Sequence, residues 1–198
     1  MVRSDCFSYD ITNRYVLFCC EGGIEKVVIA KLIEGGQIVV PRKHLVKDPE
    51  TGALYTGLRS GRCIADLFLR NKDYRLNGDD RLTILRVFDT NPEKLTLPSL
   101  YRDRVITYDL LTRPEAEMLV IAKEDAFDEW DRRYRRDKRL KPSEFCKSDL
   151  KIGYQKSLRW HRNYWRDADD VANAIRAYDK HHGKQAGKDE HRLSDLLI

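Results

Sequence analysis

The chain has 198 residues, of which 35% are charged and 10% aromatic, and its formal net charge at pH 7 is +5. This length and composition fit a folded chain that buries a core without metals or disulfides, and they exclude a disordered chain. No apolar stretch is long enough to span a membrane, the N-terminus lacks a signal-peptide pattern, and the five cysteines are odd in number, so we expect a cytoplasmic protein with free thiols and no membrane contact.

The first half of the chain alternates strand and helix patterns. Tyr15–Cys20 is a run of six apolar residues, which is typical of a strand buried on both faces. In chain order, the pattern then gives a helix over 24–34, a short strand over 37–40, a loop over 41–59, a helix from Ser60, and strands over 81–89 and 104–109. Strands separated by helices predict an α/β fold with a mostly parallel sheet flanked by helices.

The second half of the chain has helical patterns. Pro114 stands where a first-turn proline belongs, and we predict one helix from there through Trp130. A shorter helix starts at Pro142, and a long last helix spans about 155–180. The predicted division of the chain is an α/β core over 1–112, a helical, basic region packed on that core over 113–182, and a tail over 183–198 whose leucine-rich end can dock.

Acidic side chains follow the two strongest strands at the point where each strand ends. Glu21 comes directly after the first strand, and Asp89 ends the strand 81–89 and is followed by Asn91 and Glu93. If the two strands are parallel neighbours, these side chains meet at the ligand-binding edge of the sheet. Clustered carboxylates repel unless a cation neutralises them, and their hard oxygen atoms suit Mg²⁺ or Mn²⁺. Such a metal can orient a phosphate and activate a water.

Several acids in these segments also have a purely structural interpretation. Glu25 can favour the positive N-terminal end of its helix, and Asp89 can belong to an ordinary turn. Thr112 and Glu115 have the spacing of a helix capping box. Glu117 lies two residues further on and faces another side of the same helix.

Three motifs stand in a definite order between residues 14 and 122. In "VLFCCEGGIEKVVIAKLIEGG" a strand delivers a glutamate–glycine pair into a turn and a helix, in "LRVFDTN" a strand ends in an aspartate, and "TRPEAEMLVI" follows. The first two motifs resemble those of the TOPRIM domain, the topoisomerase–primase fold. The third resembles the segment after the core in small bacterial TOPRIM-like proteins of the RloB and OLD-nuclease type.

The resemblance implies a Mg²⁺ site that supports cleavage or transfer of phosphodiesters. By position, Glu21 is the motif glutamate, a metal ligand and general acid/base, and Asp89 is the first metal ligand. Glu25, at the start of the helix that follows Glu21, is a second catalytic candidate. Asn91 departs from the family pattern because it stands where a second aspartate is expected and offers an oxygen without charge. The acids that can compensate are Glu93, Glu115 and Glu117.

Positive charge is concentrated between residues 131 and 166, where the net charge is +9, against −4 for the rest of the chain. Basic side chains pair with phosphates and aromatic rings stack on bases, so we expect a nucleic acid as the partner. The candidate binding residues are Arg132, Arg133, Arg135, Arg136, Lys156, Arg159 and Arg162. For residues 151–166 the alternative is a packed helix whose aromatic side chains belong to the core and whose cations face solvent.

The sequence thus favours a TOPRIM-like nuclease that acts on DNA or RNA with Mg²⁺ or Mn²⁺. The resemblance alone implies its setting, which is defence or mobile-element biology in bacteria or phages. The alternative is a catalytically degenerate TOPRIM-like subunit that binds nucleic acid or a protein partner, and the sequence leaves the oligomeric state open. The absence of GxxxxGK[ST] and GxSxG motifs excludes P-loop NTPases and α/β-hydrolases.

Overall fold

The computed structural model describes residues 3–71, 81–89, 95–97, 99–101, 103–113, 115–182 and 191–198. Within these residues, one four-stranded sheet has the order β2-β1-β3-β4, and all its neighbouring strands are parallel. The strands are β1 (Tyr15–Cys20), β2 (Thr56–Gly57), β3 (Leu82–Phe88) and β4 (Val105–Leu111). The predicted α/β fold with a parallel sheet is therefore confirmed.

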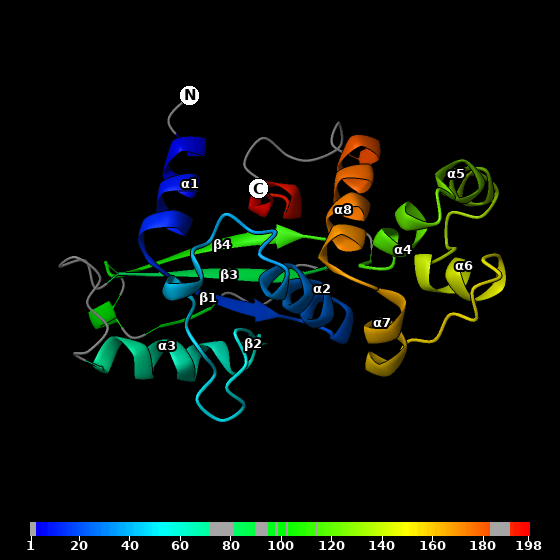
Figure 1. The fold of residues 1–198 in the computed structure, drawn as a ribbon. Helices are drawn as coiled ribbons and strands as arrows, with labels where there is room; N and C mark the ends of the chain where they lie inside the picture. Colours follow the sequence, from blue (N-terminus) through cyan, green and yellow to red (C-terminus); the bar gives the residue numbers. More distant parts are fainter. Residues whose placement is uncertain are drawn as a thin grey trace.

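The two strongest predicted strands are adjacent, as expected from their sequence. β1 pairs with β3 in register from Tyr15 opposite Leu82 to Cys20 opposite Val87. Both β1 and β3 therefore end at the same edge of the sheet, and their carboxyl ends point toward the helical region (Figure 1).

The predicted strand over 37–40 is wrong, because Ile38 makes only an isolated bridge with the C-terminal segment.

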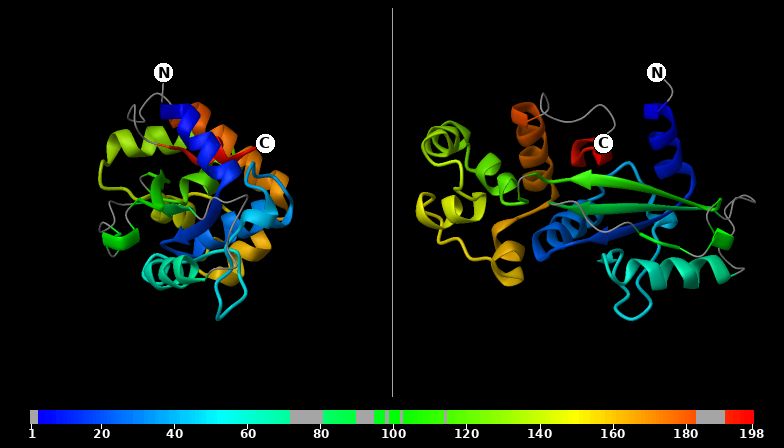
Figure 2. Two further views of the ribbon diagram at one scale, coloured as in Figure 1. Left: turned by 90° about the vertical axis from the view of Figure 1, so that its left-hand side faces the viewer. Right: turned by 180° about the vertical axis from the view of Figure 1, so that it is seen from behind.

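Helices cover both faces of the sheet (Figures 1 and 2). On one face lie α1 (Arg3–Asn13), α2 (Gly23–Glu34) and α8 (Ala168–His182), and on the other lies α3 (Gly61–Arg70). Each face of the sheet carries its own hydrophobic core, and alternate β1 residues belong to one or the other. Val16, Phe18 and Cys20 pack in the larger core, while Leu17 and Cys19 pack in the core beneath α3. Because both faces are covered, the strand needs an unbroken apolar run.

The helical region contains more breaks than its sequence pattern predicts. Its members before α8 are α4 (Met118–Lys123), α5 (Phe127–Arg136), α6 (Pro142–Ser148) and α7 (Leu158–Tyr164). The predicted continuous helix through Trp130 is wrong: it stops at α4, where Asp125 takes a positive φ of 52° and Ala126 donates to the Ile121 carbonyl, a Schellman-type ending.

The predicted long helix over 155–180 is also wrong. It is divided at Trp165, which is fully buried and donates its N–H to the His161 carbonyl at the end of α7. Asp167 then accepts a hydrogen bond from the Asp170 N–H at 2.8 Å and so caps the start of α8. The division lets α7 turn away from α8 toward the N-terminal end of α2 (Figure 1).

The C-terminal segment is docked on the domain. The described residues also form three short 3₁₀ helices, namely η1 (Arg42–His44), η2 (Ser99–Tyr101) and η3 (Leu193–Leu196). In η3, Leu196 is fully buried and its carbonyl accepts the Val39 N–H at 2.8 Å. The expected docking of the leucine-rich end is therefore seen. None of the helices in the described ranges is both long and apolar enough to cross a membrane.

Candidate functional site

The carboxyl ends of β1 and β3 place two acids side by side. Glu21 continues the ladder beyond β1, because its N–H donates to the Val87 carbonyl at 2.9 Å. Its side-chain Oε2 accepts the backbone N–H of Asp89 at 3.2 Å. The first acid after each strand thus lies at the same point of the sheet edge, as the parallel pairing predicts.

The glycine after Glu21 makes room for a third acid. Gly22 is the N-cap of α2, and a Cβ atom at this position would lie 2.6 Å from Glu25 Oε2. The Glu25 carboxylate folds back over the first turn of α2 and accepts a hydrogen bond from its own N–H. The Glu-Gly turn therefore brings the carboxylates of Glu21 and Glu25 to the same place.

Glu25 is buried, with 6% of its surface exposed. Burial, together with the nearby charges of Asp89, Glu117 and Glu21, raises its pKa to about 7, although the hydrogen bond from its own N–H acts in the opposite direction. A carboxyl group with this pKa is both a proton donor and a proton acceptor at neutral pH.

A fourth acid comes from the helical region. Glu117 precedes the first turn of α4 and is only 2% exposed. Its Oε1 accepts a 2.6 Å hydrogen bond from the Tyr154 hydroxyl and lies 3.5 Å from Lys156 Nζ. Burial alone would lower the pKa of Lys156, but the carboxylates of Glu117 and Glu115 outweigh it and raise that pKa. Lys156 therefore stays charged beside the acids.

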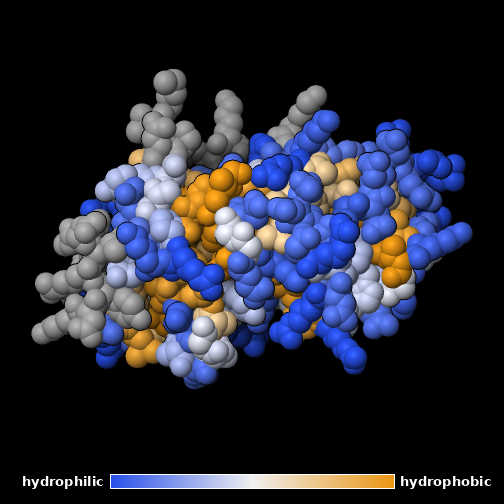
Figure 3. Space-filling view, viewed as in Figure 1, coloured by the Kyte–Doolittle hydropathy of each residue, from blue (hydrophilic) through white to orange (hydrophobic). Residues whose placement is uncertain are grey.

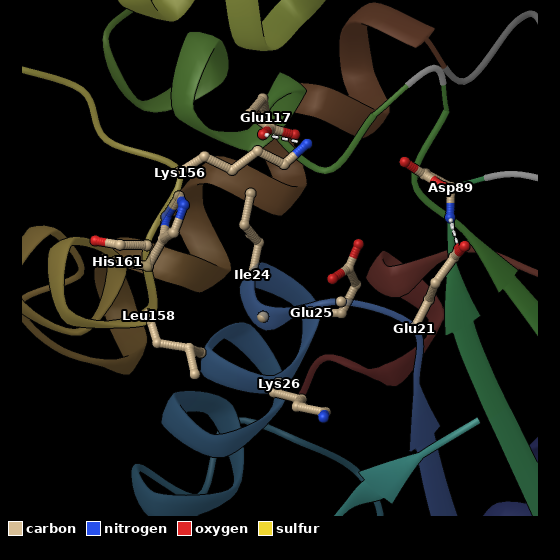
Figure 4. A pocket seen from close by; sticks show the side chains of 12 residues that line it. Glu21, Ile24, Glu25, Lys26, Asp89, Glu117, Lys156, Leu158 and His161 are labelled. Carbon is tan, nitrogen blue, oxygen red and sulfur yellow. Dashed lines mark hydrogen bonds and ion pairs between the residues drawn. The ribbon is translucent and has the colours of Figure 1, made fainter. Parts of the chain in front are cut away.

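These side chains line one cavity of about 480 Å³, which we call the acidic pocket (Figure 4). Its lining residues are Glu21, Gly22, Gly23, Ile24, Glu25, Lys26, Asp89, Glu117, Lys156, Ser157, Leu158 and His161. Glu21, Glu25 and Asp89 lie on one side of the view, and Lys156, Leu158 and His161 lie on the other. The pocket therefore joins the sheet edge to the segment that leads into α7.

The sequence analysis missed His161 as a pocket residue. It is 1% exposed, and neither ring nitrogen has a hydrogen-bond partner among the described residues. Burial, with a smaller effect from Lys156, lowers its pKa to about 4, so the ring is neutral at pH 7. The only signal in the sequence is a histidine among basic and aromatic residues, which does not reveal that the ring faces a cavity.

Other predicted site residues lie elsewhere. Glu115 is absent from the pocket lining and its Oε2 accepts the Ser143 N–H at 2.9 Å, so it fixes the start of α6. The predicted capping box is wrong, because the Thr112 hydroxyl donates to the Phe88 carbonyl instead. Asn91 and Glu93, which were predicted as metal ligands, fall outside the described residues.

The pocket suits a partly hydrated cation better than a closed metal cage. Across the described part of the chain, no three His, Cys, Asp or Glu side chains are grouped closely enough to hold a metal ion. Mg²⁺, however, usually keeps several waters and uses one or two carboxylates plus substrate phosphates. The pocket lining carries four acids and two lysines, so a further positive charge would be electrostatically favourable there. The donor set at Glu21 and Asp89 therefore fits such an ion.

The predicted basic surface is exposed in the helical region. The α5 arginines are Arg132, Arg133, Arg135 and Arg136, and all four are exposed. Arg133 Nε lies 3.1 Å from Asp149 Oδ1, and Arg159 and Arg162 on α7 are exposed too. Hydrophilic side chains cover much of this face of the molecule, including the part over α5 to α7 (Figure 3).

The aromatic side chains of residues 151–166 follow the packed-helix alternative. Tyr154 and Trp165 are buried in the larger core. Trp160 and Tyr164 are half-buried and stack on each other, with ring centroids 4.4 Å apart. Rings engaged in this way are not free platforms for bases, so any contact of this segment with nucleic acid depends on its cations.

Comparisons with known proteins leave the chain without an assigned relative. No protein-family model matches it, and neither the curated proteins nor the solved structures contain a significant match. What the structure establishes is an α/β domain with an all-parallel sheet of four strands in its described part, followed by a helical region, with an acidic pocket at the junction.

Proposed function

We propose that this protein is a TOPRIM-like nuclease that binds Mg²⁺ in the acidic pocket and cleaves phosphodiester bonds of DNA or RNA. The observation that supports this most strongly is the convergence of Glu21, Glu25, Asp89 and Glu117 on one cavity at the carboxyl ends of two parallel strands. The motif resemblance supports the same proposal, since the first two acids follow their strands in the TOPRIM order.

Each pocket residue has a role in the proposed reaction. Glu21 and Asp89 would hold the cation, which when bound supplies charge neutralisation for the phosphate and lowers the pKa of a water. Glu25 is the candidate to take up or release a proton, because its pKa of about 7 in the metal-free protein leaves both forms populated at neutral pH. Lys156 lies across the pocket from the sheet edge and can pair with a phosphate oxygen (Figure 4).

The basic surface would hold the rest of the nucleic acid. The exposed α5 arginines, with Arg159 and Arg162, belong to the same helical region that closes the pocket. Arginine contacts to phosphates give affinity without sequence preference, which suits an enzyme that acts on the backbone. A cytoplasmic role in bacterial or phage defence extends this proposal and is supported by the resemblance alone.

A second candidate function is a catalytically degenerate subunit that binds nucleic acid or a protein partner. The observation that favours it is the lack of a ready three-ligand metal cluster in the described residues. In that case the acidic pocket has no catalytic metal, and the basic helices carry the function.

A cleavage assay separates the two candidates. Single- and double-stranded DNA and RNA are incubated with the purified chain and Mg²⁺ or Mn²⁺, with and without EDTA. We expect metal-dependent cleavage that disappears in Glu21→Gln and persists in Glu50→Gln, a control at an exposed loop position. Binding without cleavage in any of these conditions would favour the degenerate subunit. Equal cleavage by wild type and Glu21→Gln would contradict the assignment of the pocket.

A further inference from the structure

His161 is a buried polar side chain whose hydrogen-bonding capacity is unused in the described structure. A neutral imidazole carries one N–H donor and one nitrogen acceptor. Both ring nitrogens of His161 are inaccessible to solvent and lack a partner among the described residues. Leaving such groups unpaired in a protein interior is unfavourable, and buried polar groups without partners are rare in native proteins. The ring packs edge to face against Tyr154 and Trp160, and its two unpaired nitrogens leave it able to hydrogen-bond to a ligand.

The surroundings of His161 indicate what kind of ligand this is. The ring lines the acidic pocket together with the apolar side chains of Ile24 and Leu158. Leu158 is 44% exposed, which is unusual for a leucine, so it offers apolar surface to a ligand in the pocket. This side of the pocket offers apolar surface and one hydrogen-bonding ring, a combination that suits a flat polar heterocycle or a sugar.

The opposite side of the pocket offers different chemistry. Glu21 and Asp89 lie there at the sheet edge, and Lys156 faces them from the His161 side (Figure 4). A phosphate fits this arrangement, because it can pair with Lys156 and bridge to a cation held by the acids. The volume of about 480 Å³ lies within the usual range for small-molecule sites and is far too small for a duplex.

We propose that the acidic pocket takes a single nucleotide unit, with its phosphate beside Lys156 and the sheet edge and its base or sugar against Ile24 and Leu158, hydrogen-bonded to His161. The proposal rests on the proposed function for the class of ligand. It adds that one nucleotide of a strand enters the pocket, and that His161 is a substrate-binding residue.

The ligand reaches the ring by displacing a side chain. Lys156 has the most freedom to move, since its side chain is 68% exposed and its contact with Glu117 is 3.5 Å long. In Figure 4 the Lys156 side chain starts near the imidazole ring and extends away from it toward Glu117. A phosphate that pairs with Lys156 would draw its ammonium group away from Glu117 and into the pocket that the ring lines.

The test is a calorimetric binding titration with 5′-mononucleotides, with inorganic phosphate and with nucleosides, each in the presence of Mg²⁺. The variants are His161→Phe and His161→Leu, which remove the ring nitrogens with two different shapes. His44→Gln is the control, because His44 is a buried histidine outside the pocket. We expect wild type to bind mononucleotides more tightly than phosphate or nucleoside. Both His161 variants should weaken mononucleotide binding roughly three- to tenfold, the effect of one hydrogen bond, and leave phosphate binding unchanged.

Melting temperature gives a second readout. At least one of the two His161 variants should melt no lower than wild type, because neither substitution removes an internal hydrogen bond of the His161 ring. Equal mononucleotide affinity in wild type and a folded His161 variant overturns the proposal, as does a large fall of melting temperature in both variants. If the His161 effect is found without any nuclease activity, the proposed function fails and the nucleotide site stands. If cleavage is found and the His161 effect is not, the nucleotide-site proposal fails and the proposed nuclease function stands.

Discussion

Replacing Glu25 by glutamine should stabilise the protein in a pH-dependent way. Glutamine keeps the size of the side chain and an oxygen that can accept the N–H of residue 25, but it carries no charge. The pKa of Glu25 is raised from 4.5 to about 7 by burial and by the neighbouring carboxylates. Ionising this side chain in the folded protein therefore costs free energy that the unfolded chain does not require.

The direction and the size of the effect follow from proton linkage. Below pH 4.5 the carboxyl group is protonated in both states, so it adds no penalty; above pH 7 it is ionised in both states, and the penalty is complete. Between these values the folded state binds more protons, so this group makes wild type less stable as pH rises. A difference of about 2.5 pKa units corresponds to roughly 3 kcal/mol, or on the order of 6–12 °C in melting temperature for a chain of this size.

The assay is thermal or urea unfolding of wild type and Glu25→Gln at pH values from 4 to 8, without divalent metal. The difference should be near zero at pH 4 and reach its maximum above pH 7. Glu50→Gln removes the same charge at an exposed position and should show little change at any pH. A Glu25→Gln difference that does not vary with pH, or a loss of stability at pH 8, would refute the burial and repulsion argued here.

Three other perturbations test the surface, the turn and the core. Changing all the α5 arginines to glutamine should weaken nucleic-acid binding, as measured by fluorescence anisotropy. The slope of log K against log salt should fall in magnitude by roughly 0.7–0.9 for each phosphate that the variant no longer binds. An unchanged slope would show that α5 is only a solvated face. Gly22→Ala should fold, since φ −115° and ψ −173° are open to alanine. Its Cβ atom would lie 2.6 Å from Glu25 Oε2 and push that oxygen aside, so the variant should alter Mg²⁺ affinity in calorimetry. Gly61→Ala should cost about 1–3 kcal/mol in urea unfolding, because its Cβ would lie 2.5 Å from the buried Cys19 Sγ, and Cys19→Ala should relieve part of that cost.

The sheet and its acidic edge were predictable because their physical causes are local in sequence. A strand covered on both faces is typically a run of mostly apolar residues. β1 is apolar throughout, and β3 is apolar except for Thr83 and Arg86, whose guanidinium is paired with Asp109. Parallel pairing then brings the residues after the strands together, so Glu21 and Asp89 could be placed beside each other from the sequence. The Glu-Gly turn followed by a helix was visible for the same reason.

The other half of the pocket was not predictable, because it depends on how separate helices pack. Glu117 was predicted only as one of three acids that could compensate for Asn91, because its contact with Tyr154 joins residues 37 positions apart in the chain. His161 reaches the pocket only because the chain breaks at Trp165 and sends α7 back against α2. The α1 helix was not predicted either, since it has few apolar residues and buries mainly Phe7 and Ile11, with Asp10 bonded to the Tyr108 hydroxyl.

The central claim, that the acidic pocket holds a divalent cation, is tested most directly by titrating Mg²⁺ into metal-free wild type and Glu21→Gln while following the melting temperature. A ligand that binds only the folded state stabilises it by RT ln(1 + [L]/Kd), which is about 2.7 kcal/mol at a hundredfold excess over Kd. We predict a saturable rise for wild type and a much weaker one for Glu21→Gln. No rise in wild type at millimolar Mg²⁺ or Mn²⁺, or the same rise in both proteins, would contradict the claim.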